Sequence, residues 1–259
     1  MPSEMLTERV DSVLVLTISD PSTRNTLSHQ AIAAGIEALG VAEADAGVRC
    51  VVLRGDGAHF CAGGNLQGLM ERRAAGPPVQ RQMLEHLHQF VEALRACPKP
   101  VIACVEGAAA GAGFSLALAC DLIVAADDAR FILSYGRIGL SPDGGATWSL
   151  SQALPRALVQ KLVWLGEPVT AAQLQGWGLV GWLAGSGLAY SESLRVAQRL
   201  AEMAPNAVAS AKELVQQAGS QTLTQQLGAE RDHFIGNLFH ANGAEGLQAF
   251  MDKRPPAFT

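Results

Sequence analysis

Three apolar segments rich in β-branched residues are each followed by a glycine-bearing loop and then by a helical pattern. The apolar segments cover residues 13–19, 48–55 and 101–105, and the helical patterns cover 28–44, 78–97 and 114–120. Short strands are also expected at 122–126 and 131–133. A recurring strand–loop–helix unit predicts an α/β layer whose loops gather at one end of the sheet.

After residue 145 the strand signals nearly vanish and helical spacing dominates. The sequence predicts an α/β core over residues 1–200 and a C-terminal helical region over 201–259. The amphipathic helices of that region are suited to cover the core or to pack against another subunit. The expected helices span 143–154, 156–165, 171–176, 192–204, 207–218, 222–240 and 242–253.

Composition and charge exclude several classes of function. The chain has 259 residues, of which 49% are hydrophobic and 17% charged, so it can bury a large core. A formal charge of −5 argues against a nucleic-acid-binding face. No apolar run approaches the roughly 18 residues that a membrane span needs. The first residues, MPSEMLTERVDSV, show no signal-peptide pattern.

The cysteine and histidine spacings indicate no metal site and no disulfide framework. The five cysteines are odd in number, contain no C-x-x-C pair and lie partly in apolar segments. The pair His86 and His88 lies in a helical segment, where neighbours two residues apart point in different directions. We therefore expect free thiols, a cytoplasmic location, no bound metal and no separate cofactor.

Two glycine-rich loops are the first candidates for binding. The loop from Gly107 to Gly113 has neither the dinucleotide-binding spacing nor the G-K-[ST] of a P-loop. Small residues before a helix leave backbone N–H groups free, and the FCAGGNL loop (60–66) offers the same feature after another strand. Two such loops can direct two N–H groups at one oxygen, as in an oxyanion hole. The alternative is that the small residues only allow close packing.

The segment GLSPDGGATW (139–148) contains one carboxylate, Asp143, between a proline and two glycines. An aspartate before an apolar helical run is a favoured N-cap, because its side chain accepts hydrogen bonds from unpaired N–H groups. The other hypothesis is that Asp143 moves a proton. This segment alone favours the cap.

Five segments together resemble the crotonase (enoyl-CoA hydratase/isomerase) superfamily over nearly the whole chain. They are RNTLS (24–28), FCAGGNL (60–66), residues 99–131, PDGGATW (142–148) and EGLQAFMDKRPPAFT (245–259). The resemblance implies a core of repeated ββα units with a C-terminal helical region. It also implies assembly as trimers or paired trimers, with 201–259 as the trimerisation region.

Carried over by position, the resemblance implies site residues. Gly64 and Ala112 would donate the two oxyanion-hole N–H groups. The residues expected to bind the coenzyme A part of an acyl-CoA substrate are Arg24, Ala62, Asn65, Leu66, Phe250 and Lys253, the last two approaching from a neighbouring subunit in some members.

Two departures from the family pattern change the expected reaction. Hydratases of the family use two glutamates to activate water; the first position holds Ser115 here, and the second falls near Tyr135, also not at an acid. Without that pair, water addition lacks its acid and base. Asp143 matches instead the branch with a single acid after a proline, which includes enoyl-CoA isomerases. The sequence looks closest to the phenylacetate-pathway type, and the resemblance outweighs the N-cap reading.

The resulting hypothesis is an enoyl-CoA isomerase that shifts a double bond by a 1,3-proton transfer through a stabilised dienolate. The alternatives are hydration, attack of Asp143 on an aryl-CoA ring, and a catalytically silent acyl-CoA binder. A nonpolar pocket around the base is expected, with Tyr135 also able to place a hydroxyl near the thioester. The candidates for its lining are Phe114, Ile132, Tyr135, Ile138 and Trp148.

Overall fold

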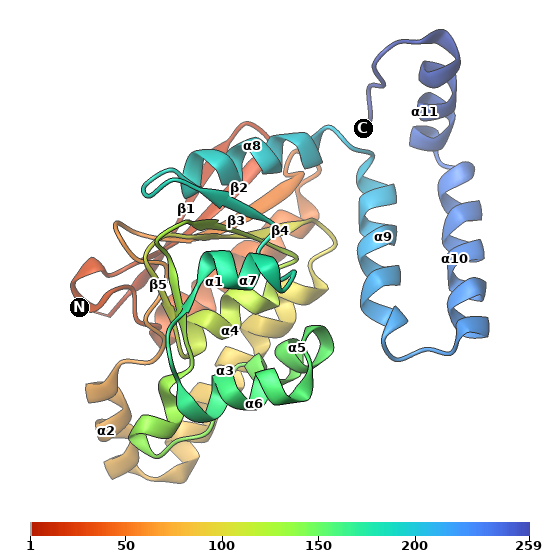
Figure 1. The fold of residues 1–259 in the computed structure, drawn as a ribbon. Helices are drawn as coiled ribbons and strands as arrows, with labels where there is room; N and C mark the ends of the chain where they lie inside the picture. The colour runs from red at the N-terminus through yellow and green to blue at the C-terminus, as the bar shows by residue number, and fades with distance from the viewer. Residues whose placement is uncertain (1) are drawn as a thin grey trace.

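A six-stranded sheet lies at the centre of the structure, a computed structural model that describes residues 2–259 (Figure 1). Its strand order is β1-β2-β3-β4-β6-β9, with β1 and β2 antiparallel and the other neighbours parallel. The strands are β1 (Glu4–Val10), β2 (Val13–Ser19), β3 (Cys50–Gly55), β4 (Val101–Val105), β6 (Leu122–Ala126) and β9 (Trp182–Ala184).

The central strands are continuous runs of apolar residues because they are buried. All five residues of β4 and five of the six in β3 are buried, as expected for parallel strands covered on both faces. Helix α8 (Ala189–Ala201) covers one face, and α1 (His29–Ala44) and α4 (Ala112–Ala119) lie on the other (Figure 1). Ser28 caps α1 by accepting a hydrogen bond from the N–H of Ala31.

A second, three-stranded sheet completes the repeated units. It contains β5 (Ala108–Ala110), β7 (Arg130–Ile132) and β8 (Val169–Thr170). Three strand pairs follow this pattern along the chain: β1–β2 precedes α1, β4–β5 precedes α4, and β6–β7 precedes the 3₁₀ helix η2 (Ser134–Ile138) and α5 (Ala146–Ala153). The predicted fold class, repeated ββα units with a C-terminal helical region, is confirmed.

The remaining elements of the core are one 3₁₀ helix and four α-helices. They are η1 (Pro21–Thr23), α2 (Leu66–Ala75), α3 (Pro77–Ala96), α6 (Arg156–Leu165) and α7 (Ala171–Gly176). The sequence predicted α6 and α7 with these limits but did not predict α2. It also missed β1, β5, β8 and β9, of which β8 and β9 lie beyond residue 145, where the strand signals nearly vanish.

Helices α9 (Pro205–Ala218), α10 (Leu223–Leu238) and α11 (Ala241–Asp252) form an arm that stands away from the sheet (Figure 1). α10 begins at a capping box made by Thr222 and Gln225. The predicted boundary at residue 200 falls near the end of α8, and the role of the arm in trimerisation remains a prediction. Among residues 2–259, no helix is both long and apolar enough to cross a bilayer.

Candidate active site

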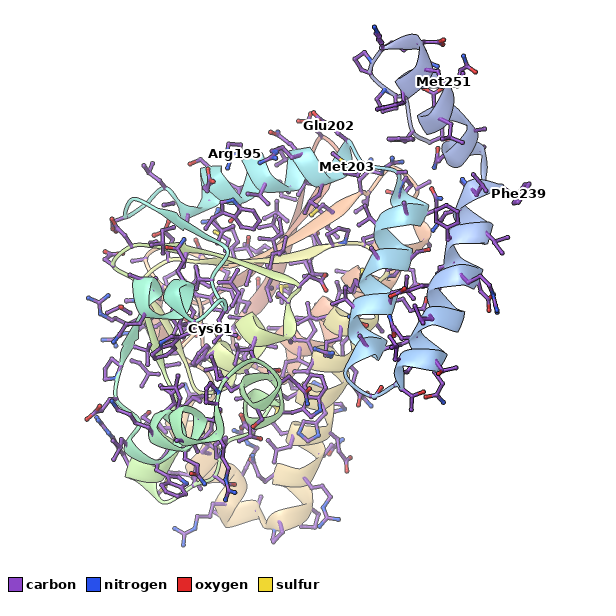
Figure 2. All side chains as sticks on the ribbon, turned by 45° about the vertical axis from the view of Figure 1, so that its right-hand side comes forward. Cys61, Arg195, Glu202, Met203, Phe239 and Met251 are labelled. Atoms are coloured by element: carbon purple, nitrogen blue, oxygen red, sulfur yellow. The ribbon has the colours of Figure 1, made fainter. Side chains whose placement is uncertain are left out.

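The two glycine-rich loops are hydrogen-bonded to each other. The N–H of Cys61 donates to the carbonyl of Ala108 at 3.1 Å, and the N–H of Ala110 donates to the carbonyl of Cys61 at 2.9 Å. Cys61 lies in the interior of the core (Figure 2), and burial raises the pKa of its thiol to about 12. The Cys61 backbone therefore holds the two loops side by side, and its thiol is a buried group that keeps its proton.

Two glycines allow this close approach. A methyl group on Gly63 would lie 2.6 Å from the carbonyl oxygen of Ala110, and Gly63 also has φ +83°. A methyl group on Gly113 would lie 2.2 Å from the carbonyl oxygen of Cys61. Because real Cβ atoms do not approach so closely, larger residues at either position would push the loops apart. The packing explanation for the small residues therefore holds at these two positions.

The N–H groups of Gly64 and Ala112 are available to a ligand. Neither has an acceptor within residues 2–259. Gly64 is exposed, and Ala112 is the first residue of α4, where the helix dipole favours negative charge. The nitrogen of Ala112 lies 2.9 Å from a methyl placed on Gly63, so the two nitrogens are within about 7 Å. This arrangement is compatible with two donors on one oxygen, and the oxyanion-hole assignment remains a proposal.

The Asp143 side chain does not cap a helix. Helix α5 begins at Ala146 with Gly145 at the N-cap, and no side chain caps it. Gly144 and Gly145 adopt left-handed backbone angles, φ +59° and +81°, which delay the helix start. The Asp143 carboxylate instead accepts a hydrogen bond at Oδ1 from the Tyr135 hydroxyl at 2.5 Å. The N-cap interpretation of Asp143 is wrong.

Ser115 and Tyr135 converge on Asp143 from two different elements. The Ser115 hydroxyl, on α4, donates to the backbone carbonyl of Asp143 at 2.8 Å. Tyr135 comes from η2, and a methyl placed on Gly111 would lie 3.4 Å from its hydroxyl oxygen. Gly111 directly precedes Ala112, so Asp143 and the proposed donor loop border the same space. The two positions expected to hold a hydratase's glutamates thus hold hydroxyls, and both contact this aspartate.

Burial sets the proton affinities of the pair. Burial raises the pKa of Asp143, while the hydrogen bond from Tyr135, the nearby His88 and its own backbone N–H lower it. Burial and the adjacent Asp143 carboxylate raise the pKa of Tyr135. Tyr135 therefore keeps its proton, and Asp143 is a carboxylate of increased basicity.

The predicted coenzyme A residues divide into two groups in space. The N–H of Ala62 donates to the carbonyl of Arg24 at 2.9 Å, so these two residues are held together beside the loop. Asn65 caps α2 by accepting a hydrogen bond from the N–H of Gly68, and Leu66 is exposed. A groove of about 700 Å³ lies next to Asn65, between α2 and the start of α1.

Phe250 and Lys253 are not part of this group in the same chain. Both lie at the end of α11, on the arm, far from α2 and α4 (Figure 1). Phe250 is 85% exposed, and its neighbour Met251 projects from the arm (Figure 2). If these residues bind substrate, they must do so at the site of another subunit.

Comparison with known proteins places the chain in a family. The family model for enoyl-CoA hydratase/isomerase matches residues 8–259. The chain belongs to the enoyl-CoA hydratase/isomerase family. It is 33% identical to the 1,2-epoxyphenylacetyl-CoA isomerase of Escherichia coli K12, with 95% of each chain covered. It is 34% identical to the 2,3-dehydroadipyl-CoA hydratase of the same organism, covering 99% of this chain and 98% of that one.

The solved structures agree with this family assignment. The crystal structure of an enoyl-CoA hydratase from Polaromonas sp. JS666 is 53% identical, with a TM-score of 0.98, and covers 99% of this chain and 100% of that one. The resemblance found in the sequence is thereby confirmed. The relatives' names include both hydratases and an isomerase, so membership of the family is compatible with either reaction.

Not all of the residues predicted to line a nonpolar pocket around the base lie beside Asp143. Tyr135 contacts the carboxylate, but Phe114 is 1% exposed and packs against Phe131 in the core, with ring centroids 5.0 Å apart. Trp148 is 52% exposed on α5, where the Arg95 guanidinium lies 4.5 Å from its ring centroid. Ile138 is also exposed. Phe114 is thus a core residue, and Trp148 and Ile138 are surface residues of this chain.

One residue that holds the loops around the site together, Asn25, was not predicted from the sequence. Asn25 is fully buried, with φ +59°, and its amide donates to the carbonyls of Asp56 and His59. Its Oδ1 accepts a hydrogen bond from the N–H of Asp20. A signal was present, since asparagine tolerates the left-handed conformation at turns.

Residues 2–259 contain no group of three or more metal-ligating side chains.

Proposed function

We propose that the chain is an enoyl-CoA isomerase that moves a carbon–carbon double bond by a 1,3-proton transfer. The observation that carries this proposal is the convergence of the Ser115 and Tyr135 hydroxyls on Asp143. This arrangement contains a single carboxylate, that of Asp143, which is largely buried and lies near two free backbone donors. One base and one oxyanion hole are what a proton shift next to a thioester requires.

In the proposed mechanism, the N–H groups of Gly64 and Ala112 bind the thioester oxygen. They stabilise the negative charge that develops when a proton leaves the adjacent carbon, and one such donor is worth about 10²–10³ in rate. Asp143 takes that proton and returns it two carbons along the chain. A positioned acid–base group typically contributes about 10²–10⁴.

The same contacts disfavour hydration. Activation of water needs a second group to accept or donate a proton on the other side of the double bond. Ser115 donates its hydrogen bond to the Asp143 backbone, and Tyr135 keeps its proton because burial raises its pKa. Neither hydroxyl replaces a glutamate in this role.

The substrate is proposed to be an acyl-CoA thioester of the phenylacetate type. The similarity to the E. coli 1,2-epoxyphenylacetyl-CoA isomerase supports a ring-derived acyl group. The 2,3-dehydroadipyl-CoA hydratase, at 34% identity, supports a straight-chain acyl group instead, and turnover of the two kinds of thioester distinguishes them. Arg24, Ala62, Asn65 and Leu66 are proposed to contact coenzyme A, and Phe250 and Lys253 to reach it from a neighbouring subunit.

A substrate panel tests the proposal. Purified protein is incubated separately with a 3-enoyl-CoA, with crotonyl-CoA and with 4-chlorobenzoyl-CoA, and products are separated by chromatography. Conversion of the 3-enoyl-CoA to its 2-enoyl isomer is expected to be the fastest reaction. Faster hydration of crotonyl-CoA, or release of chloride, would assign a different chemistry. Binding without turnover and without exchange of the substrate α-proton in D₂O would indicate a silent binder.

A further inference from the structure

The two oxygens of the Asp143 carboxylate have different environments. Oδ1 accepts a hydrogen bond from the Tyr135 hydroxyl at 2.5 Å, within the short range of hydrogen bonds to a charged oxygen. No side chain of residues 2–259 donates to Oδ2. The Tyr135 side chain therefore occupies Oδ1, whereas Oδ2 has no side-chain partner and can take up a proton from a ligand.

Both partners of this hydrogen bond are held by the surrounding structure. Tyr135 is 9% exposed, and its carbonyl accepts hydrogen bonds from the N–H groups of Gly139 and Leu140 at the end of η2. The Asp143 backbone is held by the Ser115 hydroxyl, and Gly144 packs against Ser115. A carboxylate fixed at its backbone and at Oδ1 has little freedom to rotate.

We propose that Tyr135 is a positioning residue that selects Oδ2 of Asp143 as the oxygen that carries the proton. This inference rests on the isomerase function proposed above. In the first step the substrate C–H bond breaks, its electron pair enters the dienolate, and an O–H bond forms at Oδ2. In the second step that O–H bond breaks and a C–H bond forms two carbons away. The Tyr135 proton stays on its own oxygen throughout.

The same hydrogen bond stabilises the ionised form of Asp143, which burial disfavours. The groups that act on the carboxylate are Tyr135 from η2 and His88 from α3, while α4 contributes the uncharged Ser115. Tyr135→Phe removes the hydroxyl donor and leaves burial and His88 unchanged. Since a hydrogen bond stabilises the charged form, its loss should raise the Asp143 pKa by about one to two units.

The test uses Tyr135→Phe with Tyr190→Phe as its matched control. The chain has two tyrosines, so the control removes the other phenol hydroxyl. The Asp143 pKa is measured by NMR of protein labelled with ¹³C at aspartate carboxyls, and Asp143→Asn assigns the signal. We expect the Asp143 pKa, and with it the acidic limb of kcat/KM, to move to higher pH in Tyr135→Phe. Neither should move in Tyr190→Phe.

A second measurement strengthens the hydrogen bond instead of removing it. In Tyr190→Phe protein grown with 3-fluorotyrosine, Tyr135 is the sole labelled residue, and its more acidic hydroxyl should lower the Asp143 pKa. Its ¹⁹F signal should titrate with the midpoint of the Asp143 carboxyl. This arm keeps the hydroxyl, so it remains decisive if Tyr135→Phe does not fold.

The outcomes separate this inference from the proposed function. An Asp143 pKa that is the same in wild type, Tyr135→Phe and fluorotyrosine protein would overturn the positioning role, even in an active isomerase. Absence of isomerase turnover in the wild type would overturn the proposed function, while the NMR titrations would still report whether Tyr135 controls the carboxylate.

Discussion

Single residues in the two loops have separable roles. Gly63 and Gly113 are needed because backbone atoms of the facing loop occupy the space of a side chain. Ala112 carries a methyl group in the same loop and has a free N–H. Packing and the proposed oxyanion binding therefore fall on different residues, so the donor role of Ala112 can be tested with the glycines left in place.

Ala112→Pro tests the donor role. Proline lacks the N–H but is well tolerated at the first position of a helix, which Ala112 occupies in α4. We expect isomerase turnover to fall at least about a hundredfold, with the circular dichroism spectrum retained. Ala112→Gly, which keeps the N–H, should stay within a few-fold of wild type. Equal turnover in the proline variant would mean that Ala112 donates no essential hydrogen bond.

The residues of the candidate site could be predicted from the sequence, but their contacts with each other could not. Asp143, Tyr135 and Ser115 were each singled out by position, but their contacts link residues 28 and 8 positions apart along the chain. Such contacts depend on how α4, η2 and the loop pack, which periodicity does not describe. The N-cap interpretation of Asp143 failed because two left-handed glycines postpone the helix.

At the scale of elements, buried strands and long amphipathic helices were predictable, and edge strands were not. β3 and β4 carry continuous apolar runs, whereas β1 has one buried residue, Met5, and reads as polar. β1 forms because it pairs with β2 over its whole length. The two- and three-residue strands β8 and β9 are likewise created by tertiary pairing, which outweighs weak local preference.

Lys212 links the arm to the core by hydrogen bonds and an ion pair. Its ammonium group, on α9, donates to Oδ2 of Asp121 at 2.8 Å and to the backbone carbonyls of Leu94 and Lys99. Burial raises the pKa of Asp121, and Lys212 opposes this increase. One cation thus joins α9 to the end of α3 and to the start of β6.

Lys212→Met should loosen this connection. Removing one partner of a largely buried ion pair leaves an unpaired charge, so we expect the free energy of unfolding to fall by about 2–4 kcal/mol. Urea denaturation followed by circular dichroism measures the loss. Lys161→Met, at an exposed position of α6, is the control and should change stability little. Equal midpoints for both variants would show that the pair contributes nothing.

At the scale of the whole molecule, the arm exposes an apolar surface that the chain itself does not cover. Phe234, Phe239 and Phe250 are 68%, 84% and 85% exposed, and Phe239 projects from the end of α10 (Figure 2). Patches of this kind usually mark an interaction surface. Docking on a second copy of the chain would cover them, and it would bring Phe250 and Lys253 to another subunit.

We therefore predict a trimer or a hexamer in solution. Light scattering at micromolar concentration should give three or six times the 27.1 kDa of one chain. Phe239→Asp should weaken assembly, because it places a charge in the buried interface. A monomeric mass for the wild-type protein would contradict the proposed role of the arm.

Asp143→Asn tests the central claim most directly, in the assembled enzyme with a 3-enoyl-CoA substrate. The change keeps the shape and the acceptor for Tyr135 but removes the base. Burial raises the Asp143 pKa in the folded state, so ionisation becomes a net cost to stability as pH rises above the ordinary value of 3.8. The melting temperature at neutral pH should hold or increase, while turnover falls by about 10²–10⁴ with thioester affinity kept. Isomerisation near the wild-type rate would show that Asp143 does not carry the proton.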